Sequence, residues 1–313
     1  MRLVAVPDDA PAVLALSPSF RRLQGAAEVR YFDSLPGAED VLVERVGGAE
    51  AMVNIRSSTK ITRRVMEQCA GLKMVSIWGT GTDNVDLAAA RELGIRVTNT
   101  PAVSATSIAE HTLALMLAVA RRIPAIDGRV RAGEWPRGGM VQLHGKTLGV
   151  IGLGEIGRRF ARLGEAIGMH VVTWTMHPKP ELGFAHVALD ELLAVSDVVS
   201  LHLRLSEQTR GFLGAERIAL MKRGVILVNT ARGPIVDEAA MMAALESGQL
   251  SGAGLDVFDV EPLPAGHALT RMENVVLSPH AAGITPEALE AGLALAVDNV
   301  LGHFAGEPRN VVV

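Results

Sequence analysis

Short runs of apolar residues alternate with longer stretches of helical periodicity along most of the chain. Continuous apolar runs bounded by polar, Gly or Pro residues are typical of strands that are buried on both faces. Strands that alternate with helices favour βαβ units and a parallel sheet. The pattern predicts strands at residues 2–6, 51–55 and 74–77, and a second, more apolar series at 147–152, 170–174, 198–203, 225–229, 253–258 and 274–278.

Two long segments connect these series of strands. Residues 99–122 begin in a Pro-containing loop and continue as an apolar helix that ends at Arg121 and Arg122. Near the C-terminus a second helix is predicted, with Thr285 as its N-cap and Pro286 in its first turn. A complete α/β unit therefore precedes the second series, and the C-terminal helix leads back to it.

Composition and charge narrow the class of protein. The 313 residues are 49% hydrophobic and 20% charged, as in a globular protein, and the net charge of −4 indicates neither a nucleic-acid partner nor a membrane partner. The single cysteine, Cys69, excludes an intrachain disulfide and suits a reducing compartment. The first apolar run is too short for a signal peptide, and the run at 113–120 is too short to span a bilayer. We expect a cytoplasmic protein without a metal site.

A glycine-rich turn, GLGEIG, follows the strand at 147–152 and opens a helix. In such a turn Gly152 permits the tight bend, Gly154 lets the backbone approach a pyrophosphate, and Gly157 lets the helix pack close to the strand. The phosphates then meet free N–H groups and the positive end of the helix dipole. A tight turn that binds nothing is the alternative, but the order strand, turn, helix favours a dinucleotide site.

These segments predict an α/β fold with two doubly wound domains. Residues 99–285 form a Rossmann-type dinucleotide-binding domain, which is inserted into a flavodoxin-like substrate domain made of residues 1–98 and 286–313. Ligands of open α/β sheets bind at the carboxyl ends of the strands. We therefore expect the site in the cleft between the two domains.

Three downstream stretches place a titratable or charged residue after a predicted strand. They are VILVNTARGPIVD with Arg232, AGLDVFDVEPLP with Asp256, Asp259 and Glu261, and NVVLSPHAAG with His280. Each residue alone is as typical of a solvated loop as of a site. Together they have a coherent chemistry: a guanidinium binds a carboxylate, an imidazole exchanges a proton, and a carboxylate orients the imidazole. Hydride transfer between a nicotinamide and a 2-oxo or 2-hydroxy acid needs all three.

The chain also resembles a known family over nearly its whole length. The stretches NIRSST, WGTGTDNVD, NTPAVSATSIAEH, TLGVIGLGEIGRRFA, VVSLHLRL, VNTARG, LDVFDVEPLP and SPHAAG occur in the order and spacing of the D-isomer-specific 2-hydroxyacid dehydrogenases. Phosphoglycerate dehydrogenase, glyoxylate/hydroxypyruvate reductase and formate dehydrogenase belong to this family. The resemblance implies a catalytic set of Arg232, Glu261 and His280.

The resemblance further implies an oligomeric state and two sets of ligand-binding residues. The implied assembly is a homodimer joined through the cofactor domain, with residues 120–139 as the dimer arm. The implied substrate residues are Arg56, Ser57, Trp78, Gly79, Thr80, Gly81 and Arg232. The implied cofactor residues are Gly152, Gly154, Glu155, Ile156, Gly157, Thr175, His177, Lys179, Thr230, Ala231, Arg232, Asp256, His280 and Gly283.

The sequence departs from the family pattern at two places beside the expected cofactor. Arg204 stands where the family has a Pro, and WTM replaces the usual YDP, so that Thr175 occupies the place of an acidic residue. A carboxylate there would repel the 2′-phosphate of NADP, whereas His177 and Lys179 could attract it. NAD(P) is therefore the expected cofactor, with NADP(H) favoured over NAD(H). The alternative is that Thr175 binds a ribose hydroxyl and the basic residues are solvated.

The expected activity is NAD(P)-dependent interconversion of a small 2-oxo acid, such as glyoxylate or hydroxypyruvate, and a 2-hydroxy acid of the D form. Two alternatives remain open. One is a formate- or phosphite-type dehydrogenase, and the other is a nucleotide-sensing binding protein of the corepressor type, which can retain the catalytic set. Turnover on a panel of 2-oxo acids distinguishes them.

Overall fold

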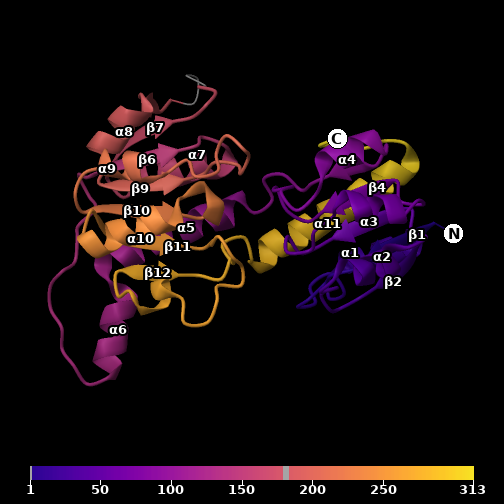
Figure 1. Ribbon diagram of the computed structural model, residues 1–313, viewed down its shortest axis with the longest axis horizontal. Coiled ribbons are helices and arrows are strands. Elements are labelled where there is room, and N and C mark those ends of the chain that lie inside the picture. The colour runs from indigo at the N-terminus through magenta and orange to yellow at the C-terminus, as the bar shows by residue number, and fades with distance from the viewer. Residues whose placement is uncertain (1, 179–182) are drawn as a thin grey trace. The chain divides into compact units, whose positions relative to one another are not determined.

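The computed structural model describes residues 2–178 and 183–313. The chain divides into two compact units, unit 1 with residues 1–104 and 284–313 and unit 2 with residues 105–283 (Figure 1). Unit 1 is therefore discontinuous in sequence.

Unit 1 contains a five-stranded parallel sheet with the order β2-β1-β3-β4-β5. The returning C-terminal helix covers one face, because Leu293, Ala296 and Val297 are buried in the same cluster as Val4 and Val53. The strands are β1 (Leu3–Val6), β2 (Glu28–Tyr31), β3 (Ala51–Asn54), β4 (Met74–Ile77) and β5 (Arg96–Thr98), and the helices are α1 (Pro18–Ala26), α2 (Glu39–Val46), α3 (Arg63–Gln68), α4 (Leu87–Glu92) and α11 (Pro286–Ala305).

Unit 2 contains a seven-stranded parallel sheet with the order β12-β11-β10-β9-β6-β7-β8, and the direction of winding reverses between β9 and β6. Such a reversal is the point at which open α/β sheets bind their ligands. The strands are β6 (Thr147–Ile151), β7 (His170–Trp174), β8 (Ala185–His186), β9 (Val198–Leu201), β10 (Val225–Asn229), β11 (Leu250–Leu255) and β12 (Val275–Leu277). The helices are α5 (Ala105–Arg121), α6 (Ile123–Arg131), α7 (Glu155–Ala166), α8 (Leu189–Val195), α9 (Ala215–Ala219) and α10 (Glu238–Ser247), with 3₁₀ turns at Gly233–Ile235 and Ala268–Arg271.

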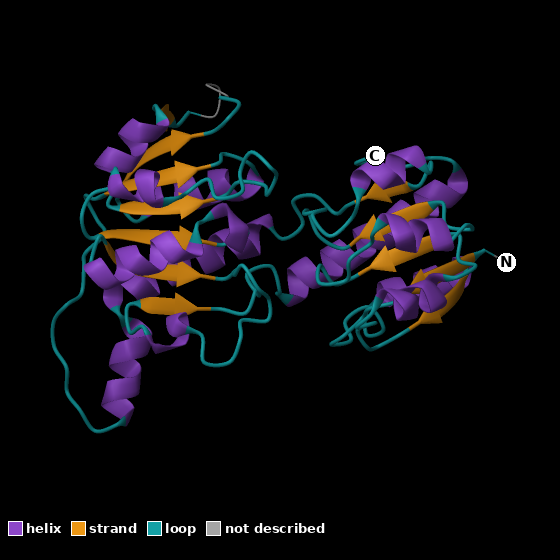
Figure 2. Cartoon of the chain, in the orientation of Figure 1, coloured by secondary structure: helices purple, strands orange, loops and turns teal. Residues whose placement is uncertain are grey.

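Helices lie on both faces of the unit 2 sheet (Figure 2). On one face α5 and α7 bury Met116 and Phe160 against β6 and β10. On the other face α8, α9 and α10 bury residues such as Leu192, Ile218 and Leu245. Because helices cover both faces of the sheet, its strands are continuously apolar. The predicted doubly wound α/β fold is confirmed.

Each of the nine predicted strands has a counterpart in the structure, with differences in where some of them begin and end. The strands β2, β5 and β8 were not predicted, because EVRY and RVT mix charged and apolar residues and β8 has only two residues. The strand predicted at 253–258 runs instead from Leu250 to Leu255, since Ser251 and Gly252 obscured its start. The predicted cap of the last helix is confirmed, with the Thr285 hydroxyl accepting the Ala288 N–H at 3.3 Å. Among the described residues, no helix has both the length and the apolar character that a membrane span requires.

Candidate active site

The turn between β6 and α7 has a backbone shape that depends on its glycines. Gly152 has φ of +98°, and a Cβ there would lie 2.5 Å from the carbonyl oxygen of His202. A Cβ on Gly157 would collide with the Gly152 carbonyl oxygen, whereas a Cβ on Gly154 would meet nothing within 4 Å. Two glycines therefore permit close packing, and Gly154 leaves the space before the helix open.

The first turn of α7 is available to an anion. Its N-cap, Gly154, offers no side-chain hydrogen bond, so the free N–H groups and the positive dipole end are not already neutralised by a cap. Glu155 forms ion pairs with Arg158 and, at 3.9 Å, with Arg159, so its negative charge is compensated on its own helix. Ile156 is half-buried behind the turn. These features fit the pyrophosphate of a dinucleotide.

His202 supports the turn from β9, the strand next to β6. Its N–H donates to the Ile151 carbonyl at 2.7 Å, and its ring centroid lies 5.3 Å from that of Phe160. Burial lowers the pKa of His202 to about 3, so the imidazole is neutral near physiological pH. Its Nε2 lies 2.9 Å from the Ser200 hydroxyl. His202 is thus a neutral packing residue beneath the glycine turn.

The segment after β7 begins beside the glycine turn, because the Trp174 carbonyl accepts the Gly152 N–H at 2.7 Å. Thr175 is half-buried and His177 is exposed. Lys179 lies outside the described residues. Arg204, which follows β9 on the other side of β6, is exposed.

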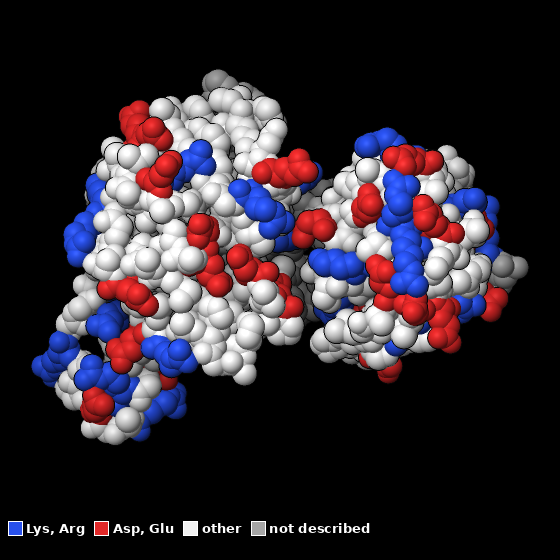
Figure 3. Space-filling view, in the orientation of Figure 1, with Lys and Arg blue, Asp and Glu red and all other residues white. Residues whose placement is uncertain are grey.

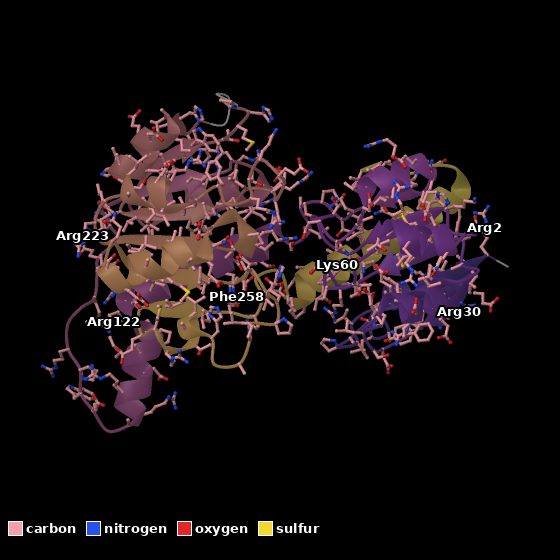
Figure 4. The ribbon with its side chains drawn as sticks, in the orientation of Figure 1. Arg2, Arg30, Lys60, Arg122, Arg223 and Phe258 are labelled. Carbon is pink, nitrogen blue, oxygen red and sulfur yellow. The ribbon has the colours of Figure 1, made fainter. Side chains whose placement is uncertain are left out.

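The loop after β10 carries Arg232 and is held by Asn229. The buried Asn229 side chain donates to the Arg232 carbonyl at 3.0 Å and accepts the Ala231 N–H at 3.0 Å. Arg232 itself donates from Nη1 to the Ala231 carbonyl at 2.8 Å. A Cβ on Gly233 would collide with the backbone of Phe258, which is labelled in Figure 4, so this glycine lets the loops after β10 and β11 touch. Asn229 and Gly233 were not predicted from the sequence, although both belong to the VNTARG stretch that contains the arginine.

Glu261 and His280 form the close pair that the sequence suggested. The Nδ1 of His280 lies 2.7 Å from Oε2 of Glu261, and Oε1 of Glu261 accepts the Phe258 N–H at 3.0 Å. Burial alone would raise the pKa of Glu261, but the hydrogen bond and charge of His280, the Phe258 N–H and the charge of Arg232 together lower it. The carboxylate is therefore ionised and accepts the proton of Nδ1. Each side chain is about a third exposed, at 33% and 32%.

The loop that carries His280 is fixed by Asp256. The Asp256 carboxylate, 1% exposed, accepts the N–H groups of Ala281 and Ala282 at 2.8 and 2.9 Å. The Asp256 carbonyl accepts the His280 N–H at 2.7 Å. His280 has φ of +53°, an unusual conformation for a residue with a side chain, which these bonds hold in place. Gly283 is half-buried at the end of the same loop, and Thr230 is buried at the end of β10.

In unit 1 the predicted substrate residues follow β3 and β4. The Arg56 N–H donates to the buried Asp8 carboxylate at 3.1 Å, and its guanidinium bonds the Pro11 carbonyl. Burial lowers the pKa of Arg56, while the charges of Asp9 and Asp8 oppose that shift. Ser57 is exposed.

The loop after β4 turns sharply at a glycine. Gly79 has φ of +142°, and its N–H already donates to the Thr100 hydroxyl at 2.8 Å. Trp78 and Gly81 are half-buried, and Thr80 is exposed. The Gly79 N–H is therefore already hydrogen-bonded within unit 1.

Known proteins resemble this chain over nearly its full length. The profile described as "D-isomer specific 2-hydroxyacid dehydrogenase, NAD binding domain" matches residues 113–282. The chain is 39% identical over 291 residues to the glyoxylate reductase of Korarchaeum cryptofilum, and the matched region covers 90% of this chain and 87% of that protein. A crystal structure of a glyoxylate reductase from Paecilomyes thermophila has a TM-score of 0.91 and 31% identity, with 99% of this chain and 98% of that chain covered. An acyclic imino acid reductase in complex with NADPH and D-Arg has a TM-score of 0.91 and 28% identity, with 100% of both chains covered.

A Rossmann-type unit with an open pyrophosphate turn is typical of dinucleotide-binding proteins, among them the dinucleotide-dependent oxidoreductases. The profile match and the identity to relatives make the class more specific. The chain belongs to the D-isomer-specific 2-hydroxyacid dehydrogenase family. It is an NAD(P)-dependent enzyme that interconverts 2-oxo and 2-hydroxy acids, as the resemblance implied.

Proposed function

We propose that this enzyme acts mainly as a reductase of small 2-oxo acids, with glyoxylate and hydroxypyruvate as candidate substrates and, where the product is chiral, a D-2-hydroxy acid as product. The 2.7 Å contact between His280 and Glu261 carries the proposal. The ionised Glu261 accepts the Nδ1 proton, which leaves Nε2 as the ring nitrogen that exchanges a proton with the substrate oxygen. A nicotinamide held by unit 2 would supply the hydride.

Arg232 is proposed to bind the substrate carboxylate and to polarise the adjacent carbonyl group. Its position supports this role, because its charge acts on Glu261 and its loop touches the loop that carries Glu261. The proposed further substrate contacts lie in unit 1 and are Arg56, Ser57, Trp78, Gly79, Thr80 and Gly81, with the bend of the second loop at Gly79.

Unit 2 is proposed to bind the cofactor and unit 1 the substrate. Gly152, Gly154, Glu155, Ile156 and Gly157 would hold the pyrophosphate. Thr230, Ala231, Asp256 and Gly283 would line the nicotinamide end, with Arg232 and His280.

NADP(H) is the proposed preferred cofactor. Thr175 brings no negative charge beside the glycine turn, and His177 is exposed there with Lys179 following in sequence. The NADPH in the imino acid reductase shows that a protein of this fold accepts the 2′-phosphate. The ratio of kcat/KM for NADPH and NADH on one substrate tests the preference, and a strong preference for NADH would exclude it.

A homodimer formed through unit 2 is the proposed assembly. Helix α6 buries none of its residues in the single chain, and Lys and Arg side chains gather over it (Figure 3). Its first residue, Ile123, is 56% exposed, and Trp135, which follows the helix, is 74% exposed, so two large apolar side chains lie on the surface of this arm. Sedimentation of the wild-type protein and of Trp135→Asp tests this: a dimer and a weakened dimer are expected, and a wild-type monomer contradicts it.

The catalytic proposal is tested by His280→Gln. We expect reduction of glyoxylate to be lost while NADPH binding, followed by nucleotide fluorescence, survives. The matched control is His267→Gln, which removes another His–Glu pair of unit 2, with His267 Nε2 3.2 Å from Glu238. Near-normal turnover in His280→Gln would remove His280 as the proton donor.

A further inference from the structure

Helix α5 lies unusually close to β11. A Cβ on Gly254 would be 3.0 Å from the Cβ of Leu115, and a Cβ on Gly252 would be 2.7 Å from a Val119 methyl group. The two strand glycines therefore let the helix approach more closely than side chains would allow. His111 lies one turn before Leu115 on the same helix face, and this approach brings it to the carboxyl end of the strand.

The imidazole of His111 faces a buried carboxylate there. Its Nε2 lies 3.7 Å from Oδ1 of Asp256, and the two side chains are 30% and 1% exposed. This separation exceeds an ordinary N–H···O bond by about 0.5 Å. The Nε2 atom is itself buried and has no hydrogen-bond partner among residues 2–178 and 183–313. A proton on Nε2 stabilises both groups, because each is otherwise a buried polar atom with an incomplete set of partners.

Thr112, the residue after His111, links helix α5 to the loop that carries Arg232. The Thr112 hydroxyl donates to the Ile108 carbonyl at 2.6 Å, and it lies 2.9 Å from the Thr230 hydroxyl. Since a hydroxyl has one proton, Thr230 must donate to Thr112. Thr230 immediately precedes Ala231 and Arg232, so adjacent residues of α5 contact the ends of both β10 and β11.

We propose that His111 is a positioning residue for His280 and acts through Asp256. With its proton on Nε2, His111 attracts the Asp256 carboxylate across 3.7 Å and restrains its position. Asp256 in turn holds the N–H groups of Ala281 and Ala282, and so sets the direction of the His280 imidazole. The proposal rests on the proposed role of His280 as proton donor and adds a second histidine, from a distant part of the sequence, to the catalytic machinery.

Two substitutions of His111 separate positioning from packing. His111→Phe keeps a ring of similar shape without a donor, and His111→Gln restores an N–H near the position of Nε2. We expect the Phe variant to lower kcat by roughly tenfold to a hundredfold, because small displacements of a catalytic group are costly. Its KM for glyoxylate should stay within about twofold of wild type. The Gln variant should recover most of the lost kcat. The control is His170→Gln, an exposed histidine at the start of β7, which should behave as wild type.

The proton position is measured directly by ¹⁵N NMR of the histidine-labelled wild-type enzyme, which does not depend on how the variants fold. A protonated Nε2 on His111 is expected, and a bare Nε2 would overturn the proposal. Wild-type kcat in the Phe variant, or equal losses in the Phe and Gln variants, would also overturn it. Normal turnover in His280→Gln would instead refute the proposed proton donor, so the two failures are distinguishable.

Discussion

Replacing Glu261 by Gln tests the electrostatic part of the proposed mechanism. The wild-type carboxylate accepts from two donors at once, the His280 Nδ1 at 2.7 Å and the Phe258 N–H at 3.0 Å. A Gln side chain has one oxygen and one amide group, so it can keep only one of these acceptor roles. The substitution therefore removes a charge. In one orientation of the Gln amide the imidazole of His280 loses its acceptor, and in the other the amide N–H group faces the Phe258 N–H and repels it.

The expected loss follows from the strength and exposure of the pair. A hydrogen bond to a charged group contributes about 1.5–3 kcal/mol. Both side chains are about a third exposed, at 32% and 33%, so solvent screening reduces this to about 1–1.5 kcal/mol. That difference corresponds to a fall in kcat/KM of about tenfold at neutral pH.

The assay is NADPH-dependent reduction of glyoxylate near pH 7 by wild type, Glu261→Gln and Glu238→Gln. The last variant is the matched control, because it removes the His267–Glu238 pair at 3.2 Å. A kcat/KM of Glu261→Gln within about twofold of wild type would refute the electrostatic role.

The same pair makes a prediction about stability and pH. The pKa of Glu261 in the folded protein is lowered from the ordinary value of 4.5. A lowered carboxyl pKa contributes stability that is complete above the unfolded value and is lost as the pH falls through the folded value. The difference in Tm between wild type and Glu261→Gln should therefore shrink in acid. A difference that grows in acid would contradict the assignment.

Three further predictions concern the cofactor side of unit 2. Gly157→Ala should lower Tm by several degrees, because the added Cβ collides with the Gly152 carbonyl oxygen. Gly154→Ala should keep a Tm close to that of wild type but bind NADPH about tenfold more weakly. Equal Tm values for the two variants would contradict the packing argument. Thr175→Asp should reduce kcat/KM for NADPH about tenfold and spare NADH, since it restores a charge that repels the 2′-phosphate, and an unchanged cofactor ratio would rule this out. The pKa of His202 is lowered by burial to about 3, so its ring should show no NMR titration between about pH 5 and 8. The buried neutral ring should also reduce folding stability as the pH falls below about 6.5, the pKa of a histidine in the unfolded chain. A titration near pH 6.5 in the folded protein would show that the ring is solvated.

The fold could be predicted where strands are buried on both faces. The apolar runs at β6, β9 and β10 are continuous because helices cover both sides of the sheet. The strands β2 and β5 could not be predicted, since their residues are charged as often as they are apolar.

The site could be predicted only in part, because some of its residues stand in recognisable local stretches and others meet only when the chain folds. Arg232, Glu261 and His280 stand in recognisable stretches after strands, so their chemistry was visible in sequence. The contacts that hold them were not visible, because Asn229, Asp256 and His111 reach these loops only in the folded chain; Asp256 was expected at the cofactor but not as a partner of the Ala281 and Ala282 N–H groups. The contact between His111 and Asp256 joins residues that are far apart in sequence, and no local pattern indicates it.

The most direct test of the proposed function is to supply hydroxypyruvate, glyoxylate and longer 2-oxo acids to the wild-type enzyme with NADPH and with NADH, and to determine the chirality of the product formed from hydroxypyruvate. The account predicts oxidation of the nicotinamide that depends on the 2-oxo acid, a higher kcat/KM with NADPH, and a D-2-hydroxy acid as product. Absence of turnover on every 2-oxo acid with either cofactor, or an L-product, would contradict it.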